Sequence, residues 1–152
     1  MTYLTQDIKP VSYMEEGKSK GIAVDLLKNV LETLDANVSE DNIIVANWPW
    51  AYDQALNGTN TVLYLTKRIP DREDLFKWAR PVMTNDVVIF ARRGTDITVQ
   101  DLDNLNQYRI GIINNSGSKW ILPAHGYQES NFVYGENVED MLNLLDHDMI
   151  DL

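Results

Sequence analysis

The chain has 152 residues and a formal net charge of −10 at pH 7, with 23 acidic against 13 basic side chains. This length is enough for a compact core, and the acidic balance argues against binding to nucleic acids or anionic lipids. No cysteine is present, which excludes disulfides, thiolate nucleophiles and cysteine–zinc sites. No apolar run reaches the roughly 20 residues of a membrane span, and the first ten residues lack the pattern of a signal peptide.

Strand and helix patterns alternate along the chain. Apolar runs and helical spacing predict, in the first half of the chain, a strand at 2–8, a helix at 22–35, a strand at 43–46, a helix at 48–58, a strand at 61–65 and a helical turn at 71–76. In the second half they predict a strand at 86–91, a short helix at 98–105, a strand at 109–113, a helix from 116, a strand at 131–134 and a helix at 137–147. Such alternation is typical of parallel βαβ units, so we predict an α/β fold. Ligands of open α/β sheets bind at the carboxyl ends of the strands.

A group of basic residues follows the strand at 61–65, although the chain as a whole is acidic. Its members are Lys67, Arg68, Arg72, Lys77 and Arg80. Arg72 is the best anion ligand among them, because the guanidinium fork matches the two oxygens of a carboxylate. Thr66 could donate its hydroxyl to the same group. The simpler interpretation is a surface network of Arg72 with acidic neighbours, while Lys67 and Arg68 are expected to be solvated.

A second segment at a strand end is "NNSGSKW" at 114–120. Gly117 permits close backbone approach, and Ser116 or Ser118 is predicted to cap the following helix, whose free N–H groups would suit a carboxylate or phosphate. The spacing is not that of a P-loop. An ordinary helix cap is the simpler interpretation.

Aromatic residues also lie at predicted strand ends. Tyr13, Trp48 and Trp50 could form the wall of a small-ligand site, although core packing explains Trp48 and Trp50 equally simply. His125 and His147 lie on separate elements without metal-binding spacing. We find no catalytic constellation, and we predict neither a metal nor another cofactor.

The sequence around the basic, glycine–serine and aromatic residues named above resembles the family-3 solute-binding proteins. These are the type II periplasmic amino-acid-binding proteins of ABC uptake systems. The resemblance rests on five segments in family order: "PVSYMEEGKSKGIAVDLLKNVLETL", "WPWAYDQALNG", "KRIPDREDLFKWARPV", "DLDNLNQYRIGIINNSGS" and "MLNLLDHDMIDL". Each motif is loose, but together they cover essentially the whole chain.

The resemblance implies two α/β lobes that close on a small ligand, with lobe 1 at 1–87 and the crossover strand with a partial lobe 2 at 88–152. The family's carboxylate-binding arginine falls on Arg72, its first-loop aromatic on Tyr13, and its helix-start pair on Gly117 and Ser118. Thr66 and Trp50 complete the predicted ligand-binding set. At the positions five and three before the arginine, where the family often has hydroxyl residues, this chain has lysine and isoleucine.

The chain ends in "MIDL", which looks like the beginning of another strand. We therefore expect a truncated lobe 2 without the return crossover, and exposed strand edges make a homodimer possible. The resemblance implies a periplasmic or extracytoplasmic protein that binds a small polar amino acid or related carboxylate and delivers it to a membrane permease. The alternatives are the ligand-sensing domain of a signalling receptor and an enzyme similar to cyclohexadienyl dehydratase.

Overall fold

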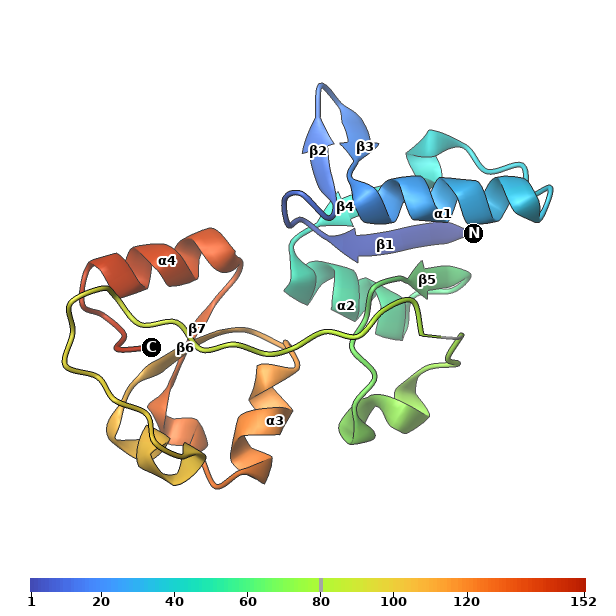
Figure 1. Cartoon of the computed structure of the whole chain (residues 1–152). Coiled ribbons are helices and arrows are strands. Elements are labelled where there is room, and N and C mark those ends of the chain that lie inside the picture. The colour runs from blue at the N-terminus through green and yellow to red at the C-terminus, as the bar shows by residue number, and fades with distance from the viewer. Residues whose placement is uncertain (80) are drawn as a thin grey trace. The chain divides into compact units, whose positions relative to one another are not determined.

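The structure is a computed structural model that describes residues 1–79 and 81–152. The chain divides into two units, the first formed by Met1–Arg68 with Arg72–Trp78 and the second by Ile69–Asp71 with Ala79–Leu152. Each unit contains its own parallel sheet (Figure 1). The lobe boundary between residues 87 and 88 stays a prediction.

The first unit is built on a three-stranded parallel sheet of order β4-β1-β5. Its strands are β1 (Thr2–Gln6), β4 (Ile43–Ala46) and β5 (Thr61–Leu63), and its helices are α1 (Ile22–Thr33) and α2 (Trp48–Asn57). Successive side chains of a strand point to opposite faces, and both Tyr3 and Leu4 are buried. Both faces of β1 are therefore covered, with α1 packed through Val24 and Leu31 on the face of Tyr3.

The predicted loop after β1 contains a β-hairpin that the sequence analysis missed. Strands β2 (Tyr13–Glu15) and β3 (Lys18–Lys20) pair antiparallel across Glu16 and Gly17, whose φ angles are 51° and 75°. Two consecutive positive φ angles are typical of a type I′ turn. The hairpin is attached to the sheet by the Ser19 hydroxyl, which donates to the Ile43 carbonyl at 2.8 Å.

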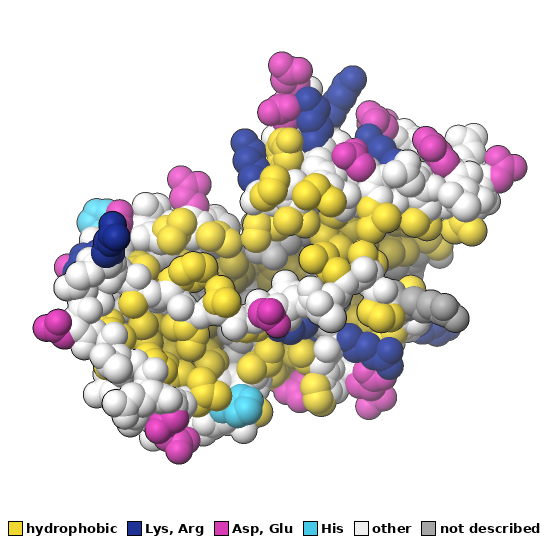
Figure 2. Space-filling view, in the orientation of Figure 1, with side chains coloured by type: hydrophobic (Ala, Val, Ile, Leu, Met, Phe, Trp, Pro, Cys, Tyr) yellow, Lys and Arg dark blue, Asp and Glu magenta, His cyan; other side chains and the backbone are white. Residues whose placement is uncertain are grey.

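Helix α1 carries more apolar surface than its own unit covers. Ile22, Leu26, Val30 and Leu34, spaced four residues apart, are all exposed, and hydrophobic side chains gather along α1 in Figure 2. Spacing by four places these residues in one row along the helix. The predicted helix is thus confirmed, with one apolar row towards the core and a second towards solvent.

The second unit contains the parallel strands β6 (Ile110–Ile113) and β7 (Phe132–Gly135) with helices α3 (Ser118–Ala124) and α4 (Val138–Asp146). Two short 3-10 turns, Leu102–Gln107 and Glu129–Asn131, belong to this unit, whereas Glu40–Asn42 belongs to the first unit and Pro70–Leu75 has residues in both. The second core consists of Leu105, Ile110, Ile112, Leu122, Tyr127, Phe132 and Leu152.

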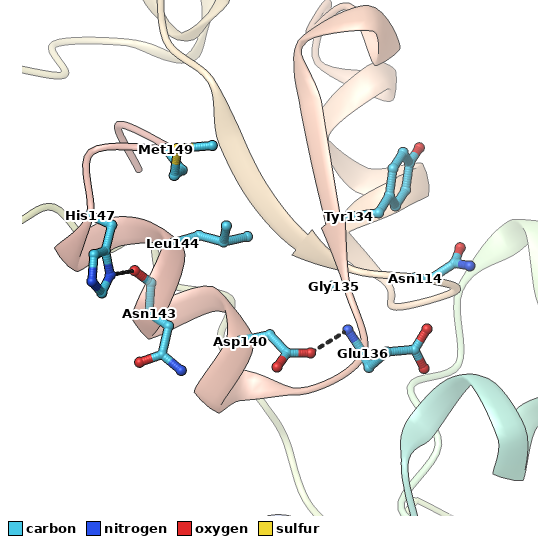
Figure 3. A pocket seen from close by; sticks show the side chains of 9 residues that line it. All are labelled: Asn114, Tyr134, Gly135, Glu136, Asp140, Asn143, Leu144, His147 and Met149. Atoms are coloured by element: carbon cyan, nitrogen blue, oxygen red, sulfur yellow. Dashed lines mark hydrogen bonds between the residues drawn. The ribbon is translucent and has the colours of Figure 1, made fainter.

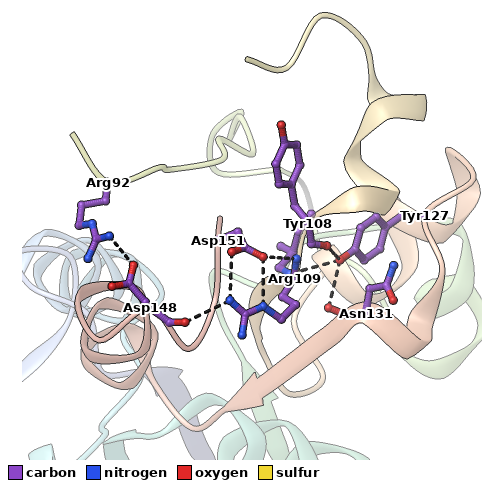
Figure 4. A network of polar contacts seen from close by, with 8 residues as sticks. Arg92, Tyr108, Arg109, Tyr127, Asn131, Asp148 and Asp151 are labelled. Carbon is purple, nitrogen blue, oxygen red and sulfur yellow. Dashed lines mark hydrogen bonds and ion pairs between the residues drawn. The ribbon is translucent and has the colours of Figure 1, made fainter. Parts of the chain in front are cut away.

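A polar network fixes the edge of this second sheet (Figure 4). The Tyr127 hydroxyl accepts from the Ile110 N–H at 3.2 Å and donates to the Tyr108 carbonyl at 2.7 Å. The Asp151 carboxylate accepts from both the side chain and the backbone N–H of Arg109. The Gly111 N–H donates to the Leu152 carbonyl at 2.9 Å, so the last residues lie beside β6, although they form no strand of their own.

The strand predicted at residues 86–91 is wrong. These residues form no strand, and their apolar side chains are exposed. An apolar run becomes a strand only where a neighbouring strand supplies hydrogen-bond partners, and none of the described strands pairs with this segment.

Candidate functional site

The site of the first unit is centred on Arg72, in the short 3-10 turn Pro70–Leu75 that follows β5. Arg72 is only 1% exposed. Its guanidinium carbon lies 5.3 Å from the centroid of the Trp48 ring and 4.9 Å from that of Tyr52, while Nη1 donates to the Lys67 carbonyl at 3.2 Å. The arginine is thus packed against two neighbouring aromatic rings and is not part of a solvated surface network.

Helix α2 supplies both rings. Its N-cap is Asn47, whose side chain accepts from the Trp50 N–H at 2.9 Å. Trp48 and Tyr52 are four residues apart, on the same buried face of the helix, with centroids 5.5 Å apart. Phe76 extends the array, 5.8 Å from Tyr52. Aromatic packing of this kind immobilises a long side chain that would otherwise sample many rotamers.

The electrostatics of Arg72 reflect this burial. Desolvation lowers the pKa of its guanidinium, and an interaction with Tyr52 offsets part of that effect. An arginine stays protonated at neutral pH even so. The result is a fixed positive charge near the carboxyl end of β5, where an open α/β sheet binds its ligands.

The remaining basic residues of the segment behave differently. Arg68 is exposed, forms an ion pair with Glu73 and lies over the Trp78 ring at 5.6 Å. Lys77 is also exposed. Arg80, the last member of the group, lies outside the described residues. Lys67, which was expected to be solvated, is half-buried. Arg72 is therefore the fully buried member among those that the structure describes, and an exposed pair such as Arg68–Glu73 adds little stability.

The other site residues predicted in the first unit lie in three different settings. The Thr66 hydroxyl donates to the Leu63 carbonyl at 3.1 Å. Tyr13 belongs to the hairpin, with the Lys9 ammonium 5.2 Å from its ring centroid. Trp50 is 43% exposed, so core packing does not explain it. Their roles in ligand binding stay predictions.

Sequence reasoning offered Trp48 as a possible wall of a small-ligand site but left it out of the predicted ligand-binding set, and it assigned no role to Tyr52. Both rings contact Arg72 directly. The available signal was their spacing of four residues on a predicted helix that begins at a strand end. That pattern places two rings on one helix face, but it does not reveal which side chain they enclose.

In the second unit, Gly117 and Ser118 follow β6 at the beginning of α3. Gly117 is the N-cap, and no side chain makes a capping hydrogen bond there; the prediction that Ser116 or Ser118 caps this helix is wrong. The Ser116 hydroxyl is buried, with no hydrogen-bond partner in the described part of the chain. A ligand role for Gly117 and Ser118 stays a prediction.

A cavity of about 600 Å³ lies in the second unit, at the carboxyl ends of β6 and β7 (Figure 3). It is lined by Asn114, Tyr134, Gly135, Glu136, Asp140, Asn143, Leu144, His147 and Met149. The Asp140 carboxylate accepts from the Glu136 N–H at 3.0 Å. Because the lining holds two carboxylates and no lysine or arginine, it is unsuited to a carboxylate ligand. None of the predicted site residues lines it.

Tyr64, directly after β5, gives the first unit a measurable pH dependence. Burial raises the pKa of its hydroxyl to about 12, and Thr5 offsets part of the effect. The pKa of an unfolded tyrosine is about 10. The protonated Tyr64 hydroxyl therefore makes its full contribution to the stability of the folded state below pH 10, and this contribution is lost as the pH rises through 12. Between these values we expect the wild type to lose about 1–2 kcal/mol more unfolding free energy than Tyr64→Phe, measured by urea denaturation at each pH. Equal losses in both proteins would contradict this expectation.

Residues 1–79 and 81–152 contain neither a cluster suited to a metal ion nor a helix suited to cross a membrane. No group of histidine, cysteine or acidic side chains there is arranged to hold a metal ion. None of the helices in the same part of the chain combines the length and apolar character needed to cross a membrane.

No protein-family model and no curated protein matches the chain, but its structure resembles solved structures over 99% of its length. A histidine kinase sensor domain with similarity to periplasmic binding proteins is 20% identical, with a TM-score of 0.76 and 65% of that domain covered. Holo ArgBP from T. maritima is 15% identical, with a TM-score of 0.78 and 66% covered. The ancestral amino acid-binding protein AncCDT-1, a precursor of cyclohexadienyl dehydratase, is 16% identical, with a TM-score of 0.76 and 68% covered.

At such identities the likeness shows the fold, and the predicted α/β fold of the periplasmic-binding-protein type is confirmed. The chain spans about two thirds of the length of these structures.

Proposed function

We propose that this chain binds a small polar amino acid or related carboxylate through Arg72, and that it does so outside the cytoplasm as a solute-binding protein for an ABC permease. The observation that carries the proposal is the buried arginine packed against Trp48 and Tyr52. Its position after β5 is the position at which the five-segment resemblance puts a carboxylate-binding arginine.

Binding would depend on the geometry of the guanidinium. Two parallel N–H groups of Arg72 would meet the two carboxylate oxygens of the ligand, which gives a bidentate, charge-assisted contact. The rings of Trp48 and Tyr52 fix the guanidinium before the ligand arrives, so little rotamer entropy is lost on binding. This role requires binding and release without turnover, and we propose that the chain is not an enzyme.

A second candidate function is ligand sensing in a signalling receptor. The observation that favours it is the likeness to a histidine kinase sensor domain, which is 20% identical to this chain. Sensing and transport would use the same amino-acid site, so binding alone does not distinguish them. A gene encoding the chain in frame with a transmembrane segment and a kinase would favour sensing, and one beside permease genes would favour uptake.

The proposed function is tested by a thermal-shift screen of the twenty amino acids, each run beside its carboxamide. We expect one chemical group of amino acids to raise the melting temperature, because a ligand that binds only the folded state stabilises it. The matching amides should have no effect, since they lack the carboxylate that Arg72 would bind. Equal shifts with acids and amides, or no shift with any amino acid at millimolar concentration, would contradict the proposal. Turnover of prephenate or arogenate would instead support the enzyme alternative.

A further inference from the structure

The segment at residues 86–92 has the sequence of a strand and no strand partner among the described residues. The exposure of its apolar side chains alternates: Val87 and Ile89 are 45% and 37% exposed, whereas Val88 and Phe90 are 63% and 66% exposed. A period of two is the pattern of an extended strand with two distinct faces. An extended apolar segment with unpaired backbone groups is a template for pairing with another strand.

We propose that this segment pairs antiparallel with the same segment of a second copy of the chain, on a two-fold axis at Ile89. In this register Val88 lies opposite Phe90 of the second copy, and Asp86 lies opposite Arg92. Each pair occurs twice because the arrangement is isologous. The even-numbered residues share one face, so two valine–phenylalanine pairs are flanked by two aspartate–arginine pairs.

Charge complementarity selects this register. If the axis lay at Val88 instead, Asp86 would lie opposite Phe90, and the register would lose both ion pairs. Aromatic–β-branched pairs and opposite charges across antiparallel strands each contribute roughly 0.2–1 kcal/mol. The Ile89 register contains both kinds of pair on the face of Val88 and Phe90, which are the more exposed of the four apolar side chains at 87–90.

Arg92 already has a partner in its own chain. Its side chain forms an ion pair with Asp148 and donates to the Asp146 carbonyl at 3.2 Å. The Arg92–Asp148 pair is solvent-exposed, and exposed pairs are weak. Because a guanidinium has five N–H donors, Arg92 can contact Asp86 of a second copy while it keeps Asp148, or exchange one carboxylate for the other.

The proposed interface is small. Seven residues per copy span roughly 23 Å of strand, whereas a stable protein interface of standard size has roughly 20–30 residues per partner. Its association should therefore be weak and concentration-dependent. It does not require Arg72 or any ligand, so its test is independent of the proposed function.

The experiment is sedimentation equilibrium of the full chain and its variants from about 5 to 500 µM. We expect a monomer–dimer equilibrium for the wild type. Asp86→Arg and Arg92→Asp should each raise the dimer dissociation constant at least about tenfold, because each places like charges opposite one another. An equimolar mixture of the two variants should recover a dimer, since every position 86 then again faces the opposite charge at position 92. Circular dichroism of each variant verifies the fold.

Leu34→Lys is the matched control, because Leu34 is equally apolar and exposed but lies at the end of α1. It should leave the dissociation constant unchanged. A wild type that stays monomeric throughout this range would overturn the proposal. So would a dimer that persists in both charge variants, one that the mixture fails to restore, or one that Leu34→Lys disrupts.

Discussion

Arg72→Met is expected to remove amino-acid binding while the protein keeps its stability. Methionine fills a similar elongated volume beside the rings of Trp48 and Tyr52, but it has no N–H groups for a carboxylate. Loss of two charge-assisted hydrogen bonds, each worth about 1.5–3 kcal/mol, should raise the dissociation constant at least about 100-fold. Because burial already disfavours the charged guanidinium, an apolar replacement should change the unfolding free energy by less than about 1 kcal/mol.

Isothermal titration calorimetry with the amino acid found in the screen measures the dissociation constant, and urea denaturation measures the unfolding free energy. Arg68→Met is the matched control, since Arg68 is exposed and pairs with Glu73 at the surface; it should leave binding unchanged. Binding that survives Arg72→Met would show that the ligand carboxylate is held elsewhere. A large loss of stability without loss of affinity would assign Arg72 a structural role.

Gly21→Ala is expected to destabilise the first unit by about 3 kcal/mol. Gly21 precedes α1 with φ at 116°, a conformation that side chains with a Cβ rarely adopt. A Cβ there would lie 2.4 Å from the Val11 carbonyl oxygen and 2.9 Å from that of Pro10. Both obstacles are backbone atoms, so no side-chain rotation relieves them. Backbone strain of about 1–3 kcal/mol in this sparsely populated region and steric overlap of similar size should add.

Gly17→Ala separates the two contributions. Gly17 also has a positive φ, but a Cβ there would meet nothing within 4 Å. The Gly17→Ala substitution should lower the unfolding free energy by only about 1 kcal/mol, because backbone strain is its only cost. Urea denaturation followed by circular dichroism compares the variants with the wild type. Equal destabilisation by both would mean that the chain around Val11 moves to make room for the new methyl group.

Much of the fold could be predicted because most elements satisfy their sequence pattern locally. Helix α1 follows from its apolar spacing, α2 from Pro49 near its start and Gly58 at its end, and the buried strands from short apolar runs. The hairpin at residues 13–20 was missed because its turn uses Glu16 before Gly17, where asparagine or aspartate is the usual signal. The segment at 86–91 was predicted wrongly because its pattern says nothing of whether a partner strand exists.

The candidate site was less predictable than the fold. Arg72 could be selected from its place after a strand and from the shape of its side chain. Its burial against Trp48 and Tyr52 could not, since that contact joins residues some 20 positions apart on different elements. Likewise, the glycine N-cap of α3 depends on the backbone conformation at residue 117, which two flanking serines do not specify.

The hydrogen bonds that join the last residues to β6 have a consequence for synthesis on the ribosome. The first unit obtains all its strands by residue 63 and its remaining residues by 78. In the second unit, by contrast, Arg109 and Gly111 bond to residues 151 and 152. Since domains generally fold N-terminal first as the chain emerges, the first unit can form early. Strand β6 must wait for its second neighbour until some 40 further residues have left the exit tunnel, and until then its edge is open to chaperones.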